Sequence, residues 1–176
     1  MTKSFVPDNL EAMPREISAG GVVIRQVGTA WEVAVIEPTR EGGTSNSAKR
    51  KAGNQGQVLA LPKGIVDQGE DAAQTALREV FEETGIKASM ITKLTDIKYV
   101  YVRSWGDKQR VFKIVSFFLL RYESGEIDDV TKEMRVEVKQ ARWIPLEGAE
   151  RRLSYRGERD VIRKAQEWLK AHAEKL

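Results

Sequence analysis

The sequence predicts an α+β fold in which one mixed β-sheet is packed between α-helices, an α/β/α arrangement. Three observations predict this fold. Apolar and β-branched runs of strand length recur along the chain. One stretch with helical periodicity interrupts these runs, and a long amphipathic stretch closes the chain. The expected order of elements is β-β-loop-β-α-β-β-β-α-α.

The first half of the chain contains the first three expected strands. ISAGGVVIRQ (17–26) is apolar and β-branched, and WEVAVIEP (31–38) alternates, so together they predict a pair of strands. Residues 39–56 are loop by composition. The short apolar run VLALP (58–62) supplies the third strand, and the glycines and aspartate of KGIVDQGE (63–70) indicate a turn.

The second half begins with a helix. Between Asp71 and Thr84 the apolar residues recur at helical spacing, and Gly85 is a natural helix stop. The remaining expected elements are strands at 89–102, 111–122 and 141–146, a short helix within 146–153 and a long amphipathic helix within 156–176.

Length and composition exclude several classes of protein. With 176 residues the chain is long enough for one domain, which we expect at 16–176 after an N-terminal extension at 1–15. The 41% hydrophobic and 31% charged residues are typical of a globular protein. No apolar run approaches the roughly 20 residues that cross a bilayer, and the N-terminus lacks the apolar segment of a signal peptide.

The residue types present also limit the chemistry. Without cysteine there is no disulfide, thiolate nucleophile or cysteine-based zinc site, and a reducing cytoplasm is the simplest location. The sole histidine, His172, lies four residues from the C-terminus, so histidine catalysis is not expected. A pI of about 9.1 raises the alternative of nucleic-acid binding. Because the aromatic residues make up 7% and fall mostly in expected core strands, we do not favour that alternative.

Charge is distributed unevenly along the chain. The net charge is +3, with acidic residues concentrated in the middle and basic residues in the loop 39–56. A basic loop beside an acidic patch suits an anionic ligand held partly through a cation. The alternative is a solvated loop without a binding role.

Three glutamates crowd the expected helix. Glu79, Glu82 and Glu83 are three or four residues apart or adjacent, so their side chains project together with Cβ atoms about 5–6 Å apart. Two carboxylates at this separation repel by about 3 kcal/mol at an effective dielectric constant of 20. Within a pocket they need a cation, and oxygen ligands without histidine or cysteine suit magnesium or manganese. The alternative is an exposed helix with salt bridges such as Arg78–Glu82.

The surrounding residues favour the metal site. GIVDQGEDAAQTALREVFEETGI (64–86) resembles the signature of the Nudix hydrolases, G-x5-E-x7-R-E-U-x-E-E-x-G-U with U a bulky aliphatic residue, at all nine specified positions. On these residues the chain is identified as a member of that family. The resemblance implies the Nudix fold and metal-dependent hydrolysis of a nucleoside diphosphate linked to another moiety. It also implies Mg²⁺ as the cofactor, with Mn²⁺ as a substitute.

The resemblance assigns roles to the residues of the motif. Arg78 orients the carboxylates, Glu79, Glu82 and Glu83 bind metal, and Gly64 or the residue before it adds a main-chain carbonyl. The expected catalytic residues are Arg78, Glu79, Glu82 and Glu83. The general base is Glu79 or, as in some members of the family, a glutamate from another loop.

The flanking residues have structural roles in this interpretation. Gly64 and Gly69 allow the loop before the helix to fold tightly. Glu70 begins the helix, where its charge suits the helix dipole, and reaches toward Arg78. The helix face that packs on the sheet carries Ala73, Ala76 and Val80.

Outside the motif, the resemblance is less specific. A glutamate six residues before the tryptophan of the closing strand is often a further ligand in the family, which here is Glu137 before Trp143. Glu133 is a weaker competitor. The alternative for either residue is an ordinary surface charge.

Substrate contacts are expected from three further residues. The tripeptide Pro62-Lys63-Gly64 resembles the branch that cleaves dinucleoside polyphosphates, and also mycobacterial-type relatives that act on oxidised guanine nucleotides. Lys63 could hold a distal phosphate as a point charge. Lys113 and Tyr101 are expected to contact phosphate and base, with ordinary strand surface as the alternative for both.

The favoured substrate is therefore a dinucleoside polyphosphate such as diadenosine tetra- to hexaphosphate. The alternatives are an oxidised nucleoside triphosphate and another nucleoside diphosphate derivative. Branches acting on RNA 5′ ends tend to carry a glutamine that this chain lacks. A non-catalytic ligand sensor is not favoured because every carboxylate of the motif is present. We expect no membrane partner, and leave a homodimer open.

Overall fold

The computed structural model describes residues 12–39, 57–103 and 106–176. Most of the expected N-terminal extension 1–15 and of the basic loop 39–56 lies outside the described residues. No helix of the described part is long and apolar enough to cross a membrane. The elements are β1 (Arg15–Val27), β2 (Ala30–Pro38), β3 (Lys63–Ile65), α1 (Ala72–Thr84), β4 (Lys87–Val102), β5 (Arg110–Ser124), η2 (Met134–Val136), β6 (Val138–Pro145), α2 (Ala149–Arg152), α3 (Arg156–His172) and η3 (Ala173–Lys175).

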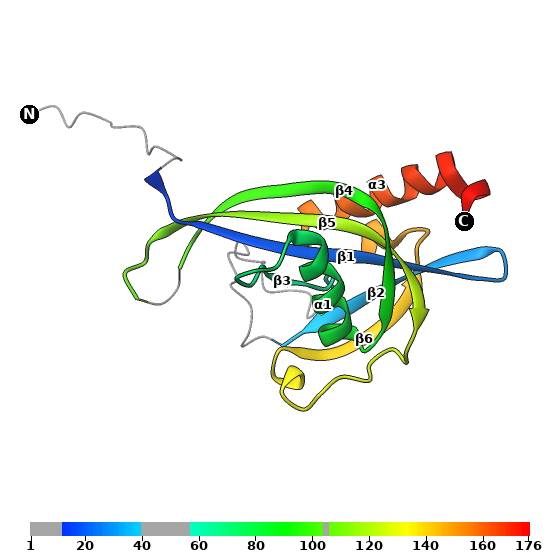
Figure 1. The fold of residues 1–176 in the computed structure, drawn as a ribbon, viewed down its shortest axis with the longest axis horizontal. Coiled ribbons are helices and arrows are strands. Elements are labelled where there is room, and N and C mark those ends of the chain that lie inside the picture. Colours follow the sequence, from blue (N-terminus) through cyan, green and yellow to red (C-terminus); the bar gives the residue numbers. More distant parts are fainter. Residues whose placement is uncertain (1–11, 40–56, 104–105) are drawn as a thin grey trace, which may run out of the picture.

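One mixed sheet organises the described residues (Figure 1). Its strands follow the order β4-β5-β1-β2-β6, with β3 paired to β1. The pairing of β1 with β5 is parallel, whereas the other pairings are antiparallel. Strands β1 and β2 form the expected pair, joined by a tight turn in which Gly28 has a φ of +63°. The sheet is therefore mixed, as the sequence predicts.

The third strand lies later in the chain than we expected. Within 58–62 the structure shows only an isolated bridge from Ala60 to Ile36, and β3 occupies Lys63–Ile65, where we expected a turn. The apolar run is instead core: Leu59 and Leu61 are buried in the cluster that includes α3. A strand this short exists because Gly64 pairs with Ala19 of β1, and composition does not reveal that pairing.

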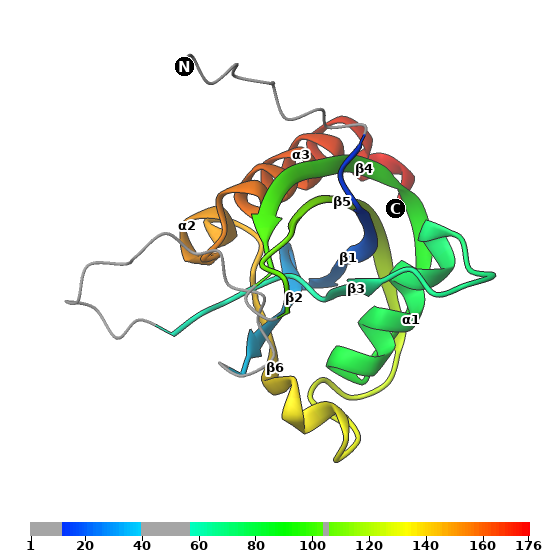
Figure 2. The ribbon, with the colours of Figure 1, turned by 90° about the vertical axis from the view of Figure 1, so that its left-hand side faces the viewer.

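Helices cover both faces of the sheet, which confirms the α/β/α arrangement (Figure 2). Val23 packs in one core with Ala76 and Val80 of α1. Val22, its neighbour on β1, packs in another core with Val161 of α3. Because successive residues of a strand point to opposite faces, α1 and α3 lie on opposite sides of the sheet.

Helix α1 begins and ends at well-defined caps. The Asp71 carboxylate accepts a hydrogen bond from the Gln74 N–H, and the Gln74 side chain accepts one from the Asp71 N–H, which forms a capping box. Gly85 ends the helix with a φ of +79°. Glu70, which we expected to begin the helix, precedes the cap. The aspartate outcompetes it because a shorter side chain reaches the free N–H groups of the first turn.

Candidate active site

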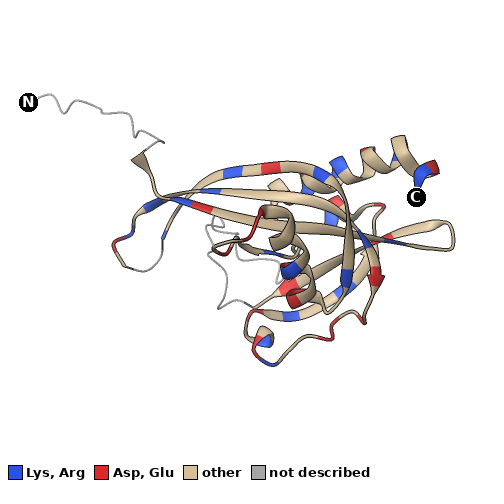
Figure 3. Ribbon diagram, viewed as in Figure 1, with Lys and Arg blue, Asp and Glu red and all other residues tan. Residues whose placement is uncertain are grey.

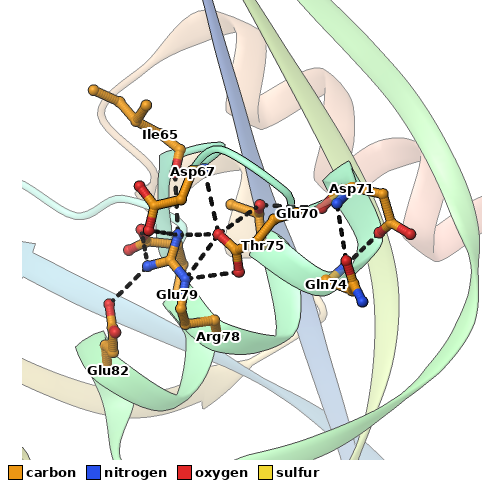
Figure 4. Close-up of polar contacts among 9 residues, drawn as sticks. All are labelled: Ile65, Asp67, Glu70, Asp71, Gln74, Thr75, Arg78, Glu79 and Glu82. Atoms are coloured by element: carbon orange, nitrogen blue, oxygen red, sulfur yellow. Dashed lines mark hydrogen bonds and ion pairs between the residues drawn. The ribbon is translucent and has the colours of Figure 1, made fainter.

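Arg78 is the centre of the polar cluster on α1 (Figure 4). Its Nε donates to Glu70 Oε2 at 2.9 Å, and its Nη1 donates to Glu79 Oε1 at 2.8 Å and to Glu82 Oε2 at 3.0 Å. Its Nη2 donates to the carbonyl oxygen of Ile65 at 3.1 Å. One guanidinium therefore ties two carboxylates of α1 to the loop and the strand that precede the helix.

These contacts stabilise the charged form of the arginine. The hydrogen bonds that Arg78 donates to Glu70 raise the pKa of Arg78 above its ordinary value despite partial burial, and Glu79 and Glu82 contribute in the same direction. Glu70 in turn reaches Arg78 as expected, although it does so from the loop. A permanently charged guanidinium can hold the planes of neighbouring carboxylates in place.

Two carboxylates of α1 are buried. Glu83 is 7% exposed, and its Oε2 accepts a hydrogen bond from the backbone N–H of Lys63 at 2.9 Å. Burial raises the pKa of Glu83 to about 8, although the Lys63 ammonium opposes the shift. Burial likewise raises the pKa of Glu79, partly offset by Arg78. The side chain of Glu82, by contrast, is 39% exposed.

Gly64 lies directly against one of these carboxylates. A Cβ atom at this position would overlap the carboxylate of Glu79. The backbone of Gly64 does not have a positive φ, so the glycine is required for close approach. Gly69 has open space around it but a φ of +87°, so glycine is required there by the backbone conformation of the turn. The two glycines that we expected to shape the loop therefore act for different reasons.

Glu137 reaches the same region from another element. It follows η2 and lines the cavity described below, and its charge acts on both Glu79 and Glu83. Glu133, at the other end of η2, is absent from the cavity lining. The structure thus places Glu137, and not its competitor, beside the buried carboxylates.

The donor set fits a hard divalent cation. Among the described residues no three acidic or histidine side chains form a ready-made metal cluster, because Arg78 binds Glu79 and Glu82 while Glu83 accepts from Lys63. Burial nevertheless raises the pKa values of the two buried carboxylates, and repulsion from neighbouring carboxylates, Glu137 among them, adds to the rise; a cation would relieve that repulsion. Oxygen donors alone suit Mg²⁺ or Mn²⁺.

A cavity of about 650 Å³ adjoins these residues. Lys63, Lys98 and Lys113 line it, and two of these lysines are paired with a carboxylate: Lys63 Nζ lies 2.8 Å from Glu158 Oε1, and Lys113 Nζ lies 2.7 Å from Glu16 Oε1. The walls also include residues of β4 and β5 and the start of α3. Figure 3 shows where the charged residues lie around the site: acidic residues lie on α1 and on the loop before it, and basic residues recur along β4.

Tyr101 lies away from this cavity. Only 3% of the residue is exposed, and its hydroxyl donates to Glu16 Oε2 at 2.7 Å. Tyr99, two residues earlier on β4, is 41% exposed and lines the cavity. Both side chains leave the strand on the same side, but the position of Glu16 on β1 decides which one is covered. The structure therefore does not bring Tyr101 to the expected substrate site.

Sequence reasoning missed Glu158, which is 3% exposed in α3. Its Oε2 accepts a hydrogen bond from the backbone N–H of Leu61 at 2.9 Å. A sequence signal for it existed. Glu158 lies three and four residues before Val161 and Ile162, so it is an acidic residue on the apolar face of an amphipathic helix. Ser18 also lines the cavity, and its hydroxyl is buried with no hydrogen-bond partner among the described residues, but its position gave no such sequence signal.

Comparison with known proteins agrees with these observations. The NUDIX domain family matches residues 28–165. The protein "Putative mutator protein MutT4" of Mycobacterium tuberculosis is 35% identical over 153 residues, which cover 86% of this chain and 55% of that protein. An RNA pyrophosphohydrolase of Sphingopyxis alaskensis is 32% identical over 101 residues, covering 51% of this chain and 62% of that protein. The chain thus spans less than two thirds of these relatives.

Solved structures share the fold. The Ap4A hydrolase of C. elegans in a binary complex has a TM-score of 0.63 at 20% identity, covering 89% of this chain and 98% of that one. The NUDIX domain of Shewanella oneidensis NrtR complexed with ADP ribose has a TM-score of 0.58 at 18% identity, covering 94% of each chain. At these identities the likeness concerns the fold alone.

Proposed function

The chain belongs to the NUDIX family, and on that premise we propose that it hydrolyses a diphosphate linkage in a nucleoside polyphosphate with a divalent cation as cofactor. One observation carries the proposal. The buried carboxylate of Glu83 lines a cavity together with Lys63, Lys113 and Gly64, and the second buried carboxylate of α1, Glu79, lies directly against Gly64. Carboxylates suit the cation and lysines suit phosphate oxygens, so a metal-bound polyphosphate matches both.

The proposed metal ligands come from three parts of the chain. They are the main-chain carbonyl of Gly64, the carboxylates of Glu79, Glu82 and Glu83, and the carboxylate of Glu137. When bound, Mg²⁺ or Mn²⁺ polarises phosphoryl oxygens and lowers the pKa of a coordinated water. Arg78 holds Glu79 and Glu82 in fixed orientations.

The remaining roles fall to residues that bind substrate or move a proton. Lys63 and Lys113 are proposed to contact phosphate oxygens, and Tyr99 replaces Tyr101 as the aromatic contact. Glu79 is the proposed general base, and its raised pKa supports that role because a base with a pKa nearer neutrality accepts a proton more readily. Glu137 is the alternative base from another loop.

For the substrate we propose a dinucleoside polyphosphate, supported by Pro62-Lys63-Gly64 and by the three lysines in one cavity, Lys63, Lys98 and Lys113. Two other candidates rest on relatives. The likeness of Pro62-Lys63-Gly64 to mycobacterial-type relatives supports an oxidised nucleoside triphosphate, and the RNA pyrophosphohydrolases support an RNA. We also propose that the protein acts in the cytoplasm. Whether the protein forms a homodimer can be measured by light scattering.

A substrate panel with and without magnesium tests this function. It should contain dinucleoside tetra- to hexaphosphates, normal and oxidised nucleoside triphosphates, a 5′-triphosphorylated RNA, ADP-ribose and a nucleotide sugar. We expect magnesium-dependent cleavage concentrated on the dinucleoside polyphosphates. Cleavage of another class would retain the hydrolase and reject that substrate. A folded protein that binds magnesium but cleaves nothing would instead support a ligand sensor.

A further inference from the structure

The segment before the metal site is hydrogen-bonded to the C-terminal part of the chain. The backbone N–H of Ser154 donates to the carbonyl oxygen of Leu59 at 2.9 Å, and the N–H of Leu59 donates to Ser154 Oγ at 3.0 Å. Two residues on, the N–H of Leu61 donates to Glu158 Oε2 at 2.9 Å. The position of Lys63 therefore depends on residues about 95 positions later in the chain.

Glu158 uses both of its carboxylate oxygens. Oε2 accepts from Leu61, and Oε1 accepts from the Lys63 ammonium at 2.8 Å. The side chain is 4% exposed, so this carboxylate is removed from water and satisfied by protein donors. A buried charge of this kind is costly unless it is paired, which makes its partner's position well determined.

Lys63 lies between two carboxylates. Its backbone N–H donates to Glu83 Oε2 at 2.9 Å, while its ammonium turns to Glu158. The side chain is 26% exposed and its Nζ lies 5.6 Å from the centre of the Tyr155 ring. An ammonium has three donors, so donors remain for a ligand in the cavity. The same residue therefore contacts a proposed metal ligand through its backbone and a structural carboxylate through its side chain.

We propose that Glu158 is a positioning residue that holds the Lys63 ammonium at the cavity and away from Glu83. Glu83 then stays free to bind a divalent cation, and the ammonium stays free to meet a phosphate. The inference rests on the proposed function, because it assigns Glu83 to the metal and Lys63 to the substrate. Without Glu158, Glu83 would be the neighbouring anion that attracts the ammonium, which would compete with the cation as an internal counter-charge.

The test measures Mn²⁺ binding in the absence of substrate, by electron paramagnetic resonance. Glu158→Gln keeps the shape of the side chain and one acceptor but removes its charge. We expect about tenfold weaker Mn²⁺ binding, the size typical of losing a residue that supports metal ligands. Glu167→Gln makes the same charge change on an exposed position of α3, and we expect its affinity to stay within about twofold of the wild type.

A double variant separates positioning from a general loss of structure. In Lys63→Gln with Glu158→Gln the competing ammonium is gone, so Mn²⁺ affinity should return toward the wild-type value while KM for the cleaved substrate stays raised. A structural role alone would give no such recovery. The double variant leaves neither charge of the Lys63–Glu158 pair without its partner, so it can still be measured if Glu158→Gln alone does not fold.

Several outcomes would overturn the inference. A folded Glu158→Gln variant with wild-type Mn²⁺ affinity would do so, as would a double variant that binds Mn²⁺ about tenfold more weakly than the wild type. Wild-type protein that does not bind Mn²⁺ would overturn both this inference and the proposed function. Wild-type protein that binds Mn²⁺ but cleaves no member of the panel would overturn the proposed hydrolysis alone, because the binding titrations still measure the effect of Glu158.

Discussion

Lys63 and Lys113 line the same cavity and each is paired with one carboxylate, yet the two pairs are built differently. Lys113 on β5 pairs in register with Glu16 on β1, so sheet pairing places their side chains together. Lys63 precedes α1, and its partner Glu158 comes from α3, 95 residues later. One pair is set by strand register and the other by the docking of a helix.

The difference predicts which pair is coupled to the metal site. The Lys63 segment also donates to Glu83, so movement there reaches a proposed metal ligand directly. In the other pair, Glu16 also accepts a hydrogen bond from the hydroxyl of Tyr101, a residue that does not line the cavity. Changes on the Lys63 side should therefore affect turnover as well as substrate affinity and should lower stability more, whereas changes on the Lys113 side should affect substrate affinity and lower stability less.

The largest effect is expected where the Lys63 segment meets α1. Glu83→Gln should lower kcat by about 100-fold or more, because a metal ligand should matter more than the supporting residues that typically cost 10–100-fold. The fold should persist, since the glutamine oxygen can still accept from the Lys63 N–H. Steady-state kinetics with a thermal melt checks this. Glu133→Gln, at a position outside the cavity lining, is the control, and wild-type turnover in Glu83→Gln would reject the metal-site assignment.

A somewhat smaller loss is expected from the backbone of the same segment. Gly64→Ala places a methyl group against the Glu79 carboxylate and should displace it. We expect kcat to fall by about 10–100-fold. Calorimetry should show a folded protein, because the φ of Gly64 is open to alanine. If kcat is unchanged in the folded variant, close approach of this backbone to Glu79 is not needed for the reaction.

Exchanging each lysine compares the two pairs directly. Lys63→Gln and Lys113→Gln should each raise KM for the cleaved substrate by about tenfold, the loss of roughly one charge-assisted hydrogen bond. The free energy of unfolding, measured in urea, should differ between the two variants. Lys63→Gln removes the ammonium partner of Glu158, whose side chain is 4% exposed, and should lower the free energy of unfolding by about 3 kcal/mol. Lys113→Gln should lower the free energy of unfolding by about 1 kcal/mol, because the Glu16 side chain is 19% exposed and keeps its hydrogen bond from Tyr101. The reverse order of stabilities would contradict the comparison.

The smallest effect is a pH dependence on the Lys113 side. Burial would raise the pKa of Glu16, but hydrogen bonds from Lys113 and Tyr101 and the charge of Lys113 outweigh it, so the pKa lies below its ordinary value of 4.5. The ionised form therefore stabilises the fold above that value, and the contribution is lost as pH falls through the lowered pKa. Glu16→Gln should melt about 2 °C or less below the wild type at pH 7, because 1 kcal/mol shifts the melting temperature of a chain of this length by about 2–4 °C and the expected change is less than 1 kcal/mol.

The test of this dependence is a series of thermal melts from pH 7 to pH 3. The gap between wild type and Glu16→Gln should narrow as the pH falls, because protonation removes the same charge from the wild type. A gap that stays constant, or widens toward acid, would show that Glu16 is not stabilised in its ionised form. Asp160→Asn, at an exposed ion pair on α3, is a matched control.

Local patterns in the sequence were sufficient for much of the fold and for the carboxylate helix. The helix stop at Gly85, the side-by-side spacing of Glu79, Glu82 and Glu83, and the reach of Glu70 to Arg78 all lie within one helix and its flanks. Such contacts follow from helix geometry, because residues three and four apart share a face. The alternation of β1 and β2 likewise predicted their pairing.

Only the tertiary structure decided which side chains meet across the chain. It placed the third strand at Lys63–Ile65, covered Tyr101 while leaving Tyr99 at the cavity, and brought Glu158 to Lys63. It also required glycine at Gly64, because the Glu79 carboxylate fills the space of a side chain. Each of these depends on packing between elements that are distant in sequence. Spacing along the chain carries no information about such distances, whereas it determines the geometry within a single helix.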